Sequence, residues 1–111
     1  MRLQESMIEK GTLLRIHEVG CEGGGLRLSL EGVLDHAGAL ALAARIAAAE
    51  REVRVVDFSL LPQISDLALG LLAHAFRDAP SIRIAGLRSH GRSILRAFGV
   101  AIPLVPEPLA A

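Results

Sequence analysis

Residues 53–80 read VRVVDFSLLPQISDLALGLLAHAFRDAP, and this stretch carries the strongest fold signal in the chain. Val53–Phe58 is apolar apart from two charged side chains, which is typical of a central, buried strand. Either Ser65 or Asp66 can then cap a helix that continues to about residue 77, before Pro80 interrupts the chain. The inward face of that helix has the i, i+3, i+4, i+7 spacing of Leu69, Leu72, Ala73 and Phe76.

Two more strands and a helix are predicted upstream. Leu13–Val19 is a short apolar run, and residues 26–31 alternate strictly, with leucines facing inward and Arg27, Ser29 and Glu31 facing outward. The glycines between the two runs predict a hairpin with a flexible loop. Asp35 is placed to cap a helix over residues 36–50, whose inner face carries Ala39, Leu42, Ala43 and Ile46.

Downstream, a fourth strand is predicted at Ile82–Ala85, and Ser89 is predicted to cap a third helix that stops at Gly99. The proline-containing tail from Ala101 is expected to add at most a short edge strand. The order β-β-α-β-α-β-α predicts one α/β domain, a sheet covered by helices. We place the domain at 13–102, between an N-terminal extension (1–12) and a Pro-rich tail (103–111).

Composition excludes several classes of protein. The chain has 111 residues, of which 51% are hydrophobic and 22% charged, so one folded domain is expected and disorder is not. A net charge of +0 and only 3% aromatic residues argue against nucleic-acid binding. The single cysteine, Cys21, excludes an internal disulfide. No apolar stretch reaches the about 20 residues of a membrane span, so we expect a cytoplasmic protein without membrane insertion.

The residues that could carry chemistry are sparse. The four histidines fall on different predicted elements, without metal-ligand spacing, so no metal site is expected. Cys21 lies in the glycine-rich loop, where nothing in the sequence lowers its pKa. We therefore predict no catalytic residue, no cofactor and no enzymatic activity.

The string GLRSHGRS at residues 86–93 resembles a phosphate-binding P-loop, but Arg92 stands where the P-loop has lysine. We do not expect nucleotide hydrolysis. Weak anion binding at this predicted helix start remains an alternative, because exposed N–H groups and the helix dipole favour it. The residues that would take part are Gly86, Ser89, Gly91, Arg92 and Ser93.

Some apolar side chains lie off the inward helix faces. Leu67 and Leu71 are on the other side of the second predicted helix, and Leu40 is similarly placed on the first. Contiguous exposed apolar surface usually marks a partner site. The alternative is that the two helices bury these leucines against each other.

From Leu26 to Gly99 the pattern resembles the STAS family, named for sulfate transporters and anti-sigma factor antagonists. The similar pieces are LEGVLD at 30–35, VVDFS at 55–59, ISDLALGLL at 64–72, IAG at 84–86 and the helix at 92–99. The resemblance implies a mixed sheet with helices packed on one side. It also implies a non-enzymatic module that binds a protein partner, and we expect the docking residues to be Ser65, Asp66, Leu67 and Leu71.

Two kinds of partner follow from the resemblance. Antagonist members bind a kinase-type anti-sigma factor, which is our first interpretation. Other members sit on the ATPase of a phospholipid-transporting ABC system. A small-molecule or nucleotide sensor that uses the loop at 86–93 is a third alternative, and a homodimer is compatible with all three.

The loop that family antagonists phosphorylate differs in this chain. Counting eight residues from Asp57 puts Ser65 at the family's aspartate and Asp66 at its phosphorylated serine. The phosphosite equivalent therefore has no hydroxyl and carries one permanent charge, whereas phosphoserine would carry about −1.5 to −2. Either the regulation is lost, or Ser65 takes the phosphate from a shifted position, or the partner is not a serine kinase.

Overall fold

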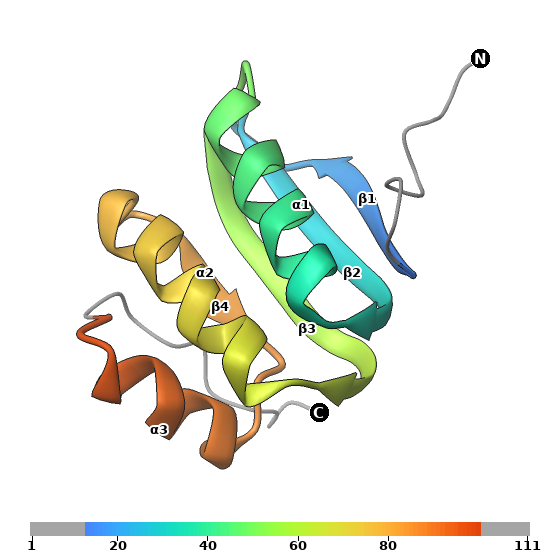
Figure 1. Ribbon diagram of the computed structural model, residues 1–111. Helices are drawn as coiled ribbons and strands as arrows, with labels where there is room; N and C mark the ends of the chain where they lie inside the picture. The colour runs from blue at the N-terminus through green and yellow to red at the C-terminus, as the bar shows by residue number, and fades with distance from the viewer. Residues whose placement is uncertain (1–12, 101–111) are drawn as a thin grey trace.

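The computed structural model describes residues 13–100, which form a four-stranded sheet and three helices in the predicted order (Figure 1). The predicted extension (1–12), the tail (103–111) and the edge strand expected after Ala101 lie outside the described residues. The elements are β1 (Leu14–Gly20), β2 (Leu26–Leu34), α1 (His36–Ala48), β3 (Val53–Ile64), α2 (Asp66–Asp78), β4 (Arg83–Ala85) and α3 (Ser89–Ala97).

The sheet is mixed, as predicted, and its strands lie in chain order. β1 pairs antiparallel with β2, while β2–β3 and β3–β4 are parallel. In Figure 1, α1 and α2 lie side by side on one face of the sheet, and α3 follows beside α2. The predicted α/β architecture is confirmed.

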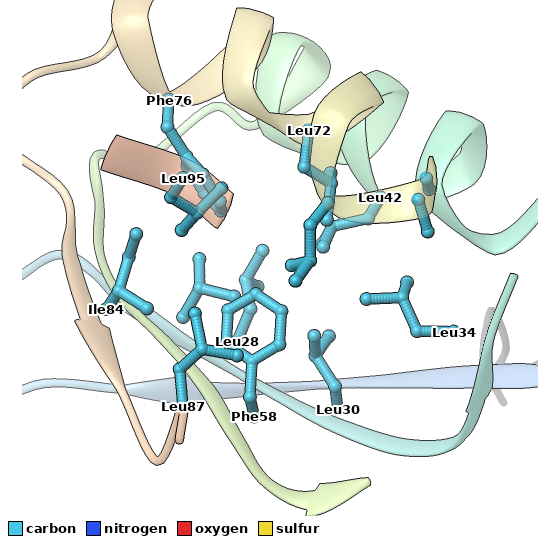
Figure 2. Close-up of a cluster of buried hydrophobic side chains, with 14 of the residues drawn as sticks. Leu28, Leu30, Leu34, Leu42, Phe58, Leu72, Phe76, Ile84, Leu87 and Leu95 are labelled. Atoms are coloured by element: carbon cyan, nitrogen blue, oxygen red, sulfur yellow. The ribbon is translucent and has the colours of Figure 1, made fainter. Parts of the chain in front are cut away.

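The core fills the space between the sheet and the helices, and it contains the predicted inward residues of β2 and α2 (Figure 2). Phe58 from β3 and Phe76 from α2 meet edge to face, with ring centroids 6.4 Å apart. Both rings are almost completely buried. These contacts fix α2 over the sheet.

A central, buried strand at Val53–Phe58 predicts that Val55 lies in the core, and that prediction is wrong. The pairing of β3 with β2 shifts in register between Leu26, which opposes Val53, and Arg27, which opposes Val55. Because the shift adds a residue to the β3 side, the next inward side chain is Val56, which is 0% exposed. Val55 is only partly buried.

Two of the three predicted helix caps are confirmed. The Asp35 carboxylate accepts a hydrogen bond from the Gly38 N–H (2.8 Å), and the Ser65 hydroxyl accepts one from the Ala68 N–H (3.2 Å). The prediction for Ser89 is wrong, because the N-cap of α3 is Arg88, which makes no side-chain capping bond.

β2 and β3 are longer than the sequence indicated. Their pairing continues to Leu34 opposite Ile64, and the Ser65 N–H donates to the Leu34 carbonyl (3.1 Å). Both strands thus end directly before a helix cap. This pairing places the starts of α1 and α2 at the same edge of the sheet.

Candidate functional site

The two stretches singled out in the sequence meet at one edge of the sheet. β3 and β4 are parallel, so their carboxyl ends point the same way, and each leads into a helix start. Such an edge is where α/β proteins commonly place binding residues. The first turn of α2 therefore lies beside the loop and first turn of α3.

Asp66 and His90 form the direct link between these stretches. The His90 Nε2 atom lies 3.0 Å from Asp66 Oδ1 and 3.1 Å from Asp66 Oδ2. Both side chains are exposed. Sequence reasoning treated Asp66 as a charge on its own, whereas the structure places an imidazole against it, and the contact becomes an ion pair when the imidazole is protonated.

Beneath this pair lies a hollow of about 180 Å³. Its walls come from the end of β3, the start of α2 and the residues around the start of α3. Asp66, Arg88 and His90 supply its charged or titratable lining. The apolar lining includes Phe58, Leu61, Ile64, Leu69 and Leu87. The hollow therefore combines an apolar interior with polar groups, as binding sites commonly do.

The rest of the predicted docking segment is divided between surface and core. Leu67 is 66% exposed, while Leu71 is partly buried and packs against the core. Leu40 on α1 is 53% exposed. The helices thus leave Leu40 and Leu67 largely uncovered. The Ser65 hydroxyl is partly buried and serves as the helix cap.

The predicted anion-binding residues are divided between the loop before α3, which holds Gly86, and the first turns of α3 itself. Gly86 has a φ of +77°, and a Cβ at this position would lie 2.5 Å from the Ser59 amide nitrogen. The Arg92 Nη1 atom donates to the Leu87 carbonyl (2.8 Å), so this guanidinium is directed back onto the loop. Gly91 is buried against Leu87, whereas Ser89 and Ser93 are exposed.

Asp57, in the signature VVDFS, makes a structural contact within the sheet. It is 9% exposed, and its side chain binds the Arg27 guanidinium and accepts from the Ser59 N–H (2.9 Å). Burial acts to raise the pKa of Asp57. The hydrogen bonds from Ser59 and the positive charge of Arg27 outweigh that effect, so the pKa of this carboxyl lies below its ordinary value of 3.8.

Across residues 13–100, no group of three or more His, Cys, Asp or Glu side chains is arranged to hold a metal ion. In the same region none of the helices has the length and apolar run needed to cross a membrane.

Comparison with known families agrees with this geometry. A family model described as "Mlab, STAS domain" matches residues 17–106, which is most of the chain. The chain therefore belongs to the STAS domain family, and the resemblance seen in the sequence is confirmed. This membership supports a regulatory or binding module in general terms. A comparison with curated proteins found no match.

Proposed function

We propose that this STAS domain is a non-enzymatic regulatory module that docks a protein partner through Ser65–Leu71. The supporting observation is the exposure of Leu67, which directly follows Asp66 of the Asp66–His90 contact at the helix-start edge of the sheet. An exposed leucine next to a charged pair offers an interface both an apolar anchor and a polar rim. Leu40 on the neighbouring helix α1 is a second exposed leucine.

The first candidate partner is a kinase-type anti-sigma factor, in keeping with the resemblance to antagonists. In that design a phosphate on the switch serine breaks the complex. Asp66 carries a fixed charge at that position and His90 lies against it, so the charge need not face the partner unpaired. Under this proposal the domain docks constitutively, and phosphorylation does not regulate formation of the complex.

A second candidate is an accessory role on the ATPase of a phospholipid-transporting ABC system. The observation that favours it is the same aspartate, because a permanently bound subunit needs no phosphorylatable hydroxyl at its interface. The Ser65 hydroxyl already serves as the helix cap, which also favours an interface without a phosphate switch.

The sensor alternative rests on the hollow beneath Asp66 and His90, which is large enough for a small apolar group. The Arg92 guanidinium binds the Leu87 carbonyl, so a phosphate would have to compete with that bond. Titration with ATP, GTP and inorganic phosphate separates this alternative from protein docking. Under the docking proposal none of these ligands saturates the site in the micromolar range.

The docking test is a titration against the two candidate partners, a purified anti-sigma kinase and an ABC ATPase. Leu67→Glu puts a charge into the proposed interface and should weaken binding at least tenfold. Leu60→Glu is the matched control, because Leu60 is similarly exposed (58%) but belongs to β3. Equal losses in both variants, or none in Leu67→Glu, would refute docking at this surface.

The role of the aspartate is tested separately, at two ionic strengths. If Asp66 opposes the partner, Asp66→Ser should tighten the complex, because an uncompensated charge is costly to desolvate. If Asp66 attracts a basic partner surface, the same change should weaken binding, and more so at low salt. If the wild type and Asp66→Ser bind the partner with the same affinity at both ionic strengths, this position does not control docking.

A further inference from the structure

The hollow beneath the Asp66–His90 contact borders the proposed docking segment, Ser65–Leu71. Asp66 and Leu69 belong to that segment and also line the hollow. Leu67, which lies between them in the sequence, is 66% exposed. A partner that covers Leu67 therefore comes within reach of the hollow.

The apolar walls of the hollow are firmly packed. Phe58 and Leu87, which lie close together in Figure 2, are almost completely buried, and so is Leu69 on α2. Because these three side chains belong to the core, the wall exists before any partner arrives. An apolar group that enters the hollow leaves water and gains contacts with a surface that needs no rearrangement.

The size of the hollow fits one side chain better than a free ligand. A cavity of about 150 Å³ accommodates benzene, so a hollow of about 180 Å³ accommodates a phenyl or isobutyl group. Pockets for drug-sized ligands are usually larger, at about 300–1,000 Å³. Protein interfaces, by contrast, commonly gain most of their affinity from a few side chains that fill small desolvated pockets.

Arg88 gives the lining of the hollow an available positive charge. It is exposed, and although it is the N-cap residue of α3, its side chain makes no capping bond. Within residues 13–100 its guanidinium has no hydrogen-bond or ion-pair partner. The Asp66 carboxylate, in contrast, lies against His90. A group that approaches the hollow therefore meets an uncompensated guanidinium, which favours a carboxylate.

We infer that this hollow receives one apolar side chain of the partner protein, of phenylalanine or leucine size. An aspartate or glutamate next to that side chain in the partner binds Arg88. This inference rests on the docking function proposed above and adds the chemistry that the partner must present. The buried apolar side chain supplies affinity, and the carboxylate at the rim fixes its orientation.

The first test compares affinities for the purified candidate partners. Ile64→Phe enlarges a partly buried side chain in the wall and should weaken binding at least about tenfold. Leu60→Phe is the matched control on the same strand, because Leu60 is 58% exposed and lies outside the hollow. Arg88→Gln changes an exposed side chain without a structural contact, so it tests the inference even if Ile64→Phe folds poorly.

The loss in Arg88→Gln should be about threefold to tenfold, and it should shrink at high salt. Arg83→Gln, at an exposed arginine of β4 outside the hollow, is its control and should bind like the wild type. Normal affinity in both Ile64→Phe and Arg88→Gln would overturn the inference.

The second test needs no partner and uses two small probes, 3-phenylpropionate and 3-phenylpropan-1-ol. NMR should show both probes shifting the methyl signals of Leu69 and Leu87, with weak affinity because each probe has few atoms. The carboxylate should bind more tightly than the alcohol, and Arg88→Gln should remove that difference. Equal affinities of the two probes for the wild type would contradict the role of Arg88.

Competition separates this inference from the docking proposal itself. Saturating 3-phenylpropionate should weaken partner binding, because the probe and the partner side chain occupy the same space. If Leu67→Glu weakens the complex but the probe, Ile64→Phe and Arg88→Gln do not, docking stands and the hollow is not part of the interface. A probe that binds without competing would make the hollow a small-molecule site and overturn the inference. If Leu67→Glu binds normally, docking at this surface is refuted, and the inference falls with it.

Discussion

Replacement of Asp57 by asparagine tests the electrostatics of the sheet. Asparagine can still accept from the Ser59 N–H but loses the charge that binds Arg27. A hydrogen bond to a charged group contributes about 1.5–3 kcal/mol, and Arg27 is 42% exposed and partly screened by solvent. We expect Asp57→Asn to lower the free energy of unfolding at pH 7 by about 1–2 kcal/mol.

The pH dependence has a defined sign. The pKa of Asp57 is lower in the folded protein than in the unfolded chain, so its contribution is complete above the unfolded pKa. That contribution is lost as pH falls from about 5 through the folded pKa. Urea unfolding from pH 7 to pH 3 should therefore show a steeper loss of stability in the wild type than in Asp57→Asn.

The control is Asp78→Asn, which removes a carboxylate at the end of α2 and should change stability by no more than about 0.5 kcal/mol. Parallel pH profiles for wild type and Asp57→Asn would refute the stabilising role of the ionised Asp57 carboxylate.

Substitutions at three further positions test the packing, a turn and a helix cap. Phe76→Ala should lower the free energy of unfolding by about 3–5 kcal/mol in denaturant melts, because the ring is fully buried against Phe58. A change within about 0.5 kcal/mol would contradict that burial. Gly86→Ala should lower the free energy of unfolding by about 1–3 kcal/mol in thermal melts, because position 86 combines a positive φ with a close approach to the Ser59 backbone. An unchanged melting temperature would exclude that strain. In urea titrations, Ser65→Ala should lower the free energy of unfolding by about 1 kcal/mol because the helix cap is lost, whereas Ser65→Asp should retain most of that stability. Equal losses in the two variants would argue against capping.

Local chemistry made much of this fold predictable. Asp35 and Ser65 are residues whose short polar side chains cap helices, and both do so in the structure. Arg88 was not predictable as a cap in this way, because its side chain makes no capping bond. Val55 was wrongly predicted to lie in the core because the pairing of β3 with β2 shifts in register. The pattern of residues within one strand contains no information about such a shift, which depends on the neighbouring strand.

The sequence indicated Asp66 as a site residue but did not indicate its contact with His90. Asp66 and His90 are 24 residues apart and belong to segments that were weighed separately. Their contact arises from the parallel pairing of β3 and β4, which aligns two helix starts at one edge. Two strands of one sheet that are joined by a helix are usually parallel, and that rule was the signal that could have joined the two segments.

The most direct measurement of docking is amide mapping of the isotope-labelled chain by NMR while a purified candidate partner is added. The largest changes should fall on Ser65–Leu71 and extend to His90, which lies against Asp66. Amides of β1 should stay unaffected by the partner, because that edge lies outside the proposed docking surface. Changes confined to β1, or a bound complex that leaves Ser65–Leu71 unperturbed, would contradict the proposed docking through α2.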